Sequence, residues 1–187
     1  MSYIEPHMRE ALAGHVLCPV LDSGDFTAFH LKRVGEGRMM STLIVFTPEG
    51  IVIQGDLTPE RNGTVSNYGY GLGWFCGQLG EDYLCSKFLE KKFVPEFAMR
   101  GLRYEILQQR RDGYLEKDKA RELWDSMRWL DDPISPERTY KFWTDELRND
   151  SGEGCPGYGY EPGEAGWLCA IQQRFSELYN ATPMETP

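Results

Sequence analysis

The sequence predicts an α+β fold in which a small antiparallel β-meander of about three or more strands packs against several α-helices. Before about residue 66, short runs of β-branched and aromatic residues are separated by tight Gly and Pro turns, which is typical of a meander. After about residue 80, apolar residues recur at helical spacing. The chain has 187 residues, of which 41% are hydrophobic, so it is long enough for one buried core and short for two ordinary domains. We therefore expect a single domain over residues 1–187, with an N-terminal helix and sheet at about 1–66 and a helical half at about 80–180.

A short helix and three strands are expected in the N-terminal part. Met8, Leu12 and Val16 fall at helical spacing, and the strands follow from period-two alternation or from runs of β-branched and aromatic residues. The turns between the strands are Gly35-Glu36-Gly37 and Pro48-Glu49-Gly50. Because the last two strands are apolar at nearly every position, we expect the sheet to be covered on both faces or to contact another chain. The predicted bounds are Glu5 to Leu17 for the helix and Phe26 to Val34, Thr42 to Thr47 and Ile51 to Asp56 for the strands.

Five helices are expected after residue 80, each with an apolar stripe. The helix that begins at Pro136 has the clearest start signal, because Ser135 offers a capping hydroxyl and proline suits the first helical position. Before the last helix, the stretch from Asp150 to Gly163 is so rich in Gly and Pro that we expect a long surface loop, which carries Tyr158 and Tyr160. The other four helices are expected over Gly80 to Phe88, from Pro95 onward, over Lys117 to Leu130 and over Glu164 to Tyr179.

Charge and composition narrow the class of function. The formal net charge is −9, from 20 Lys and Arg against 29 Asp and Glu, which argues against direct nucleic-acid binding through phosphate contacts. The apolar runs are too short to span a bilayer, so we expect no membrane contact and a cytoplasmic location. The five cysteines are widely and irregularly spaced and form no close ligand pair, so we expect free thiols, no bound metal and no cofactor. We expect no catalytic residue.

An acidic, tyrosine-containing segment near the C-terminus is the first candidate site. From residue 150 onward the acids outnumber Arg174, the one cation there. Carboxylates that steer and aromatic rings that supply contact area suit a basic protein surface, although the same acids also suit a merely solubilising surface. The residues expected to bind a partner are Glu153, Tyr158, Tyr160, Glu161 and Glu164.

A second candidate site lies after the last predicted strand. A carboxylate at a strand end can act as a base or hold a metal, and glycines between the following aromatic residues let the backbone approach a ligand. The alternative is structural, with the aspartate capping its own turn and the aromatic residues filling the core. The residues of this ligand site are Asp56, Arg61, Tyr68, Tyr70 and Trp74.

The order of the parts also resembles a group of phage and prophage proteins of unassigned function. These proteins share an apolar strand, a Pro-Gly turn, a strand that ends in Gly-Asp and an aromatic-rich segment. The resemblance covers about the first half of the chain, and this sequence departs from it by inserting Glu49 into the turn and by a longer helical half. The segments that carry it are Thr42 to Phe46, Pro48 to Gly50, Ile51 to Asp56 and Tyr68 to Phe88.

The resemblance implies a role in the bacterial host cell during infection or lysogeny. Small acidic phage proteins without a catalytic signature commonly bind and block host complexes, as the anti-CRISPR inhibitors do. We therefore expect a non-enzymatic inhibitor of a bacterial defence complex, such as a CRISPR effector, whose partner surface is basic and binds nucleic acid. A homodimer is left open. The alternative function is a small nucleotide- or metal-dependent enzyme with its site around Asp56 and the Tyr68 to Trp74 loop.

Overall fold

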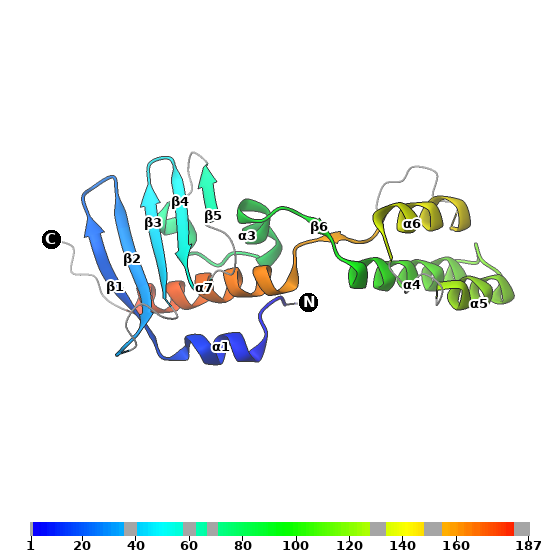
Figure 1. Ribbon diagram of the computed structural model, residues 1–187, viewed down its shortest axis with the longest axis horizontal. Helices are drawn as coiled ribbons and strands as arrows, with labels where there is room; N and C mark the ends of the chain where they lie inside the picture. Colours follow the sequence, from blue (N-terminus) through cyan, green and yellow to red (C-terminus); the bar gives the residue numbers. More distant parts are fainter. Residues whose placement is uncertain are drawn as a thin grey trace. The chain divides into compact units, whose positions relative to one another are not determined.

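The computed structural model describes residues 2–35, 41–57, 63–66, 71–127, 134–147 and 155–181, with the backbone alone for 63–66. Contacts between residues group the chain into two compact units (Figure 1). The sheet unit comprises residues 1–90 and 162–187, and the helical unit comprises residues 91–161. The last helix therefore belongs with the sheet and not with the helices that precede it in sequence. The single domain expected for residues 1–187 stays a prediction.

The sheet unit is built on an antiparallel meander, so the predicted α+β class is confirmed. Five strands pair in sequence order, each antiparallel to the next. The turn at Pro48 and Glu49 forms as expected, and the Thr47 hydroxyl accepts hydrogen bonds from the backbone N–H groups of Glu49 and Gly50 at 3.2 and 3.1 Å. The strands are β1 (His15–Asp22), β2 (Thr27–Arg33), β3 (Thr42–Thr47), β4 (Gly50–Gly55) and β5 (Gly63–Ser66).

The N-terminal helix is shorter than the sequence predicts, and strand β1 was missed. Helix α1 spans Pro6–Ala13 and ends at Gly14, so Val16 lies in β1 and not on the helix. Val16 lies four residues after Leu12, which fits a helix, but it also starts a run of β-branched and apolar residues that pairs with β2. Pro19 is tolerated there because β1 is an edge strand with one partner only, so the sheet loses no hydrogen bond that a second neighbour would need.

One face of the sheet is buried and the other is half-exposed. The alternation predicted for β2 is confirmed, since Phe29 and Leu31 are buried on one face, while His30 and Lys32 are half-buried on the other face, where Ala28 is also buried. On the other face, Leu43, Val45 and Val52 are only half-buried. Contact of that face with another chain stays a prediction. The buried face is made of Phe29, Leu31, Ile44, Phe46, Ile51 and Ile53.

Helices α2 (Leu72–Phe75), α3 (Glu81–Phe88) and α7 (Pro162–Ala181) complete the sheet unit. Rings of four phenylalanines from strands and helices meet in the core, with centroids 5.3 Å apart for Phe29 and Phe175 and 5.4 Å apart for Phe75 and Phe175. On α7, Gln172 is buried, and its Nε2 donates to the carbonyls of Phe75 at 2.6 Å and Gly77 at 3.2 Å. The aromatic stretch that ends in Phe75 therefore fills the core at that residue, as the structural interpretation of the sequence expects.

The helical unit packs α4 (Pro95–Arg111), α5 (Lys117–Ser126), α6 (Pro136–Lys141) and a π-helical turn, η2 (Phe142–Glu146). The cap predicted at Ser135 is confirmed, because its Oγ accepts from the backbone N–H of Arg138 at 3.3 Å. Tyr140 is exposed, since its helix buries Thr139 and the next residues bury Phe142 and Trp143. The core residues of this unit include Ala98, Leu102, Ile106, Leu123, Met127 and Trp143.

The loop expected over Asp150 to Gly163 is partly regular. Residues 150–154 lie outside the described residues, but strand β7 (Tyr158–Gly159) pairs with β6 (Lys92–Phe93), and α7 begins at Pro162. Two glycines let this segment lie against α4. A Cβ at Gly159 would be 2.4 Å from the Phe97 ring, and Gly157 adopts φ +116° beside Phe93. Across the described parts of the chain, none of the helices has the length and apolar character that a bilayer crossing requires.

Candidate functional site

The five residues predicted to bind a partner are placed in different settings. Glu153 lies outside the described residues. Tyr158 is 58% exposed, whereas Tyr160 is only 6% exposed, with Lys91 Nζ 5.8 Å from its ring centroid. Glu161 is half-buried in the helical unit, and Glu164, also half-buried, lies in the first turn of α7 in the sheet unit. Strand β7 ends at Gly159, so Tyr158 lies in the strand and Tyr160 follows it.

The predicted ligand site is described only in part. Arg61, Tyr68 and Tyr70 lie outside the described residues. Asp56 is exposed at the end of β4, where its backbone N–H donates to the Ser41 carbonyl at 3.0 Å. Trp74 lies on α2, half-buried, with its ring 6.1 Å from that of Tyr83 in an edge-to-face arrangement.

Three of the five cysteines have a raised pKa. All five are free. Burial raises the pKa of Cys76 to about 11 and also raises that of Cys155. On α7, the hydrogen bond with Cys85, whose Sγ is 3.7 Å away, and burial raise the pKa of Cys169. A thiol with a raised pKa stays protonated near neutral pH and is a poor nucleophile. Within the described residues, no three His, Cys, Asp or Glu side chains are grouped as a metal site would need.

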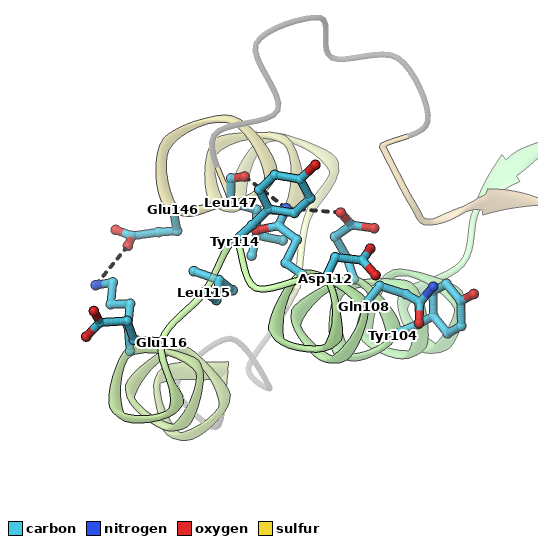
Figure 2. A pocket seen from close by; sticks show the side chains of 11 residues that line it. Tyr104, Gln108, Asp112, Tyr114, Leu115, Glu116, Glu146 and Leu147 are labelled. Atoms are coloured by element: carbon cyan, nitrogen blue, oxygen red, sulfur yellow. Dashed lines mark hydrogen bonds and ion pairs between the residues drawn. The ribbon is translucent and has the colours of Figure 1, made fainter.

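A pocket in the helical unit is the site that the sequence did not reveal. It has a volume of about 1020 Å³ and lies between the second half of α4, the α4–α5 turn, the start of α5 and the end of η2 (Figure 2). We call it the acidic pocket. Its lining consists of Tyr104, Glu105, Gln108, Gln109, Asp112, Tyr114, Leu115, Glu116, Lys119, Glu146 and Leu147.

Gln109 holds the walls of the acidic pocket together. Its carbonyl accepts hydrogen bonds from the backbone N–H groups of Tyr114 at 2.9 Å and Leu115 at 3.1 Å, which ties the α4–α5 turn back to α4. Its Nε2 donates to the Leu147 carbonyl at 3.1 Å and to Glu105 Oε1 at 3.0 Å. One side chain and its own carbonyl therefore position the turn, the end of η2 and one of the carboxylates.

The pocket carries an excess of negative charge. Four carboxylates line it against one cation, Lys119, whose Nζ lies 3.8 Å from Glu146 Oε2 and 3.2 Å from Glu122 Oε1 outside the pocket. These pairs are exposed and contribute little to stability, so the charge excess remains available to a ligand. Figure 2 shows Glu116 and Glu146 on the side of α5 and η2 and Asp112 on the side of α4.

Two tyrosines border the carboxylates. Tyr104 on α4 is 62% exposed and Tyr114 in the turn is 82% exposed. Gly113, at φ +81°, provides the left-handed backbone that the turn needs just before Tyr114. Exposed aromatic rings beside carboxylates suit a cationic side chain, which gains from both the charge and the ring face.

The sequence interpretation of this region was therefore incomplete. The mixed charges of residues 110–119 are typical of a solvated helix face, but residues 112–116 form the turn between two helices and contribute to a concave site. The available signal was Gly113 followed by Tyr114 between two predicted helices. The contribution of Glu146, more than thirty residues away, has no local signal at all.

Comparison with known protein families gives one match. A family model described as a phage family matches residues 64–179, which is more than half of the chain. The protein belongs to this phage family. No curated protein matches the chain, and no solved structure does.

The match confirms the affiliation with phage proteins, but it covers a different part of the chain from most of the segments that carry the resemblance. Of the segments that carry the resemblance, Tyr68 to Phe88 lies inside the matched region, and the strands β3 and β4 lie outside it. The expectation that the shared part covers the first half of the chain is wrong, because the match runs through the whole helical unit, including the acidic pocket.

Proposed function

We propose that this phage protein binds and inhibits a bacterial defence complex, such as a CRISPR effector, and that the acidic pocket is its contact site. The observation that supports the proposal is a concave surface with four carboxylates, one lysine and two exposed tyrosines. A partner surface that binds nucleic acid carries exposed Arg and Lys, which are the side chains that such a pocket accepts.

The pocket affects both the association rate and the lifetime of the complex. Its carboxylates attract a basic surface over several ångströms and raise the association rate, an effect that salt weakens. The rings of Tyr104 and Tyr114 provide rigid contact area around an inserted cation, which slows dissociation. Tyr158, which is 58% exposed in the same unit, belongs to the partner-binding surface that the sequence predicts.

The test is co-purification of the tagged full-length protein from bacteria that express a defined panel of defence systems, at two salt concentrations, with phage plating on the same strains. We expect one stoichiometric complex whose recovery falls with salt, and we expect Asp112→Lys and Tyr114→Ala to weaken capture and to restore defence. Asp118→Lys is the matched control, because Asp118 is exposed in the same unit but does not line the pocket. Variants that bind the complex normally yet lose inhibition would contradict the proposal, as would equal effects of Asp112→Lys and Asp118→Lys.

A further inference from the structure

Helices α4 and α5 of the helical unit pack side by side and present a second charged surface. The guanidinium carbon of Arg103 on α4 lies 5.7 Å from the centroid of the Trp124 ring on α5, which fixes where the two helices meet at the surface. A turn over residues 112–116 reverses the chain between them. Positions further toward the C-terminus of α4 therefore face positions nearer the N-terminus of α5.

Helical spacing aligns cations along this meeting line. On α4, Arg110 lies two turns after Arg103, and on α5, Lys117 lies two turns before Trp124. Arg100 precedes Arg103 by about one turn, and its guanidinium carbon lies 5.0 Å from the Phe97 ring centroid. All of the charged side chains in question are exposed. We call this surface the basic face, and it consists of Arg100, Arg103, Arg110, Lys117, Arg121 and Trp124.

Three exposed carboxylates border the basic face, and the other acidic side chains of the two helices point elsewhere. Glu105 and Asp112 line the acidic pocket, and Glu122 pairs with Lys119. Glu96 lies seven residues before Arg103 on the line of Arg103 and Arg110, and Asp118 and Asp125 lie three residues before and four residues after Arg121, so these carboxylates lie at the borders of the face. Arg103, Arg110, Lys117 and Arg121 make no ion pair with any residue in the described ranges.

The net charge of the whole chain does not describe the charge of the basic face. Residues 91–161 hold 13 of the 20 Lys and Arg and 15 of the 29 Asp and Glu, so most of the excess acid belongs to the sheet unit, with 14 acids against 7 cations. Binding to phosphates depends on the local field within about 10 Å and not on the sum over the whole chain. The argument from the net charge of −9 against nucleic-acid contact therefore does not apply to this face.

We propose that the basic face binds single-stranded nucleic acid, with its cations on the phosphates and a base stacked against Trp124. Five cations along two adjacent helices follow a backbone, and guanidinium groups bind phosphate oxygens in pairs. Trp124 is 38% exposed, and the guanidinium of Arg103 lies over its ring. An exposed ring among cations favours unpaired bases over duplex, because only unpaired bases offer a free face for stacking. This binding does not depend on the function proposed for the acidic pocket.

The experiment is fluorescence anisotropy of the full-length protein with a labelled 20-nucleotide oligo(dT), the same length of oligo(U) and a matched duplex, between 50 and 200 mM salt. We expect binding of the single strands that weakens with salt, with a slope of log K against log salt of about −0.7 for each phosphate contacted. Arg110→Glu should weaken binding about tenfold and make this slope shallower. Trp124→Leu should weaken binding about tenfold and leave the slope unchanged, since it removes stacking and no charge.

Lys141→Glu is the matched control, because Lys141 is an exposed cation on α6, outside the basic face, and undergoes the same change of charge. Far-UV circular dichroism checks that each variant folds, and Lys117→Glu replaces Arg110→Glu if the latter does not. Four results would each overturn the proposal: no binding at 50 mM salt, duplex bound as tightly as single strands, Lys141→Glu as harmful as Arg110→Glu, or Trp124→Leu without effect.

Discussion

Replacing Gln172 by methionine removes the hydrogen bonds that join α7 to the end of α2. Gln172 Nε2 donates to the carbonyl oxygens of Phe75 and Gly77 at 2.6 and 3.2 Å, and the side chain is buried. Methionine has nearly the same length and fills the same space, so packing is kept while both bonds are lost. The Phe75 carbonyl is then left in a buried place without this donor.

The magnitude follows from the two bonds. A neutral hydrogen bond contributes about 0.5 to 1.5 kcal/mol to the free energy of unfolding, and a carbonyl left unsatisfied in the interior costs about the same again or more. We expect Gln172→Met to lower the free energy of unfolding by about 1 to 3 kcal/mol. For a chain of this size each kcal/mol lowers Tm by roughly 2–4 °C.

The assay is urea denaturation followed by far-UV circular dichroism, with hydrogen exchange of the α7 amides to localise the effect to the sheet unit. Gln173→Met is the matched control, because Gln173 is the next residue on the same helix and is exposed. We expect the control to change stability by less than about 0.5 kcal/mol. If the two variants lose the same stability, or if exchange in α7 is unchanged, the hydrogen bonds of Gln172 do not hold the helix and the reasoning is refuted.

Two further outcomes test the caps and the buried thiols. Ser135→Ala should lower the free energy of unfolding by about 1 kcal/mol, because it removes the acceptor for the Arg138 N–H at the start of α6. Ser86→Ala serves as the control, because the Ser86 hydroxyl donates a hydrogen bond within α3. Equal losses of stability in urea denaturation would contradict the capping role. Stability should fall as the pH rises from about 9 to about 11, because burial raises the pKa of Cys76 from 9.0 to about 11 and the folded state then holds a proton that the unfolded state releases. The contribution of the protonated Cys76 thiol to stability is complete below about pH 9 and is lost as the pH rises to about 11. Cys76→Ala should therefore make the decline of Tm over this range shallower. An unchanged decline would show that the thiol is not responsible.

Local sequence signals predicted the elements whose neighbours in sequence are also their neighbours in space. The turn at Pro48 and Glu49 joins β3 to β4, and the alternation of β2 predicted that Phe29 and Leu31 would share a face, which is buried. Ser135 and Pro136 predicted the start of α6 because capping depends on a few adjacent residues. Strand β1 was missed because Val16 fits both a helical period from Leu12 and a strand, and only pairing with β2 favours the strand.

The candidate sites were predictable to a smaller extent. The phage affiliation followed from a resemblance, but its location did not. Tyr158 and Tyr160 look alike in a Gly-rich segment, yet in the folded chain Tyr158 is exposed and Tyr160 is buried. The acidic pocket joins Tyr104 and Tyr114 to Glu146, which lies on a different helix, so no spacing in the sequence predicts their proximity.

The sequence by itself determined the α+β class, the meander and most helix positions, because periodicity, turn residues and caps act over a few residues. Only the tertiary structure decided that α7 belongs with the sheet, that the carboxylates of α4, α5 and η2 converge on one pocket, and that cations of α4 and α5 gather around Trp124. These outcomes depend on contacts between residues far apart in the chain. The net charge of −9 sums over the whole chain, whereas a ligand meets only the charges of one face.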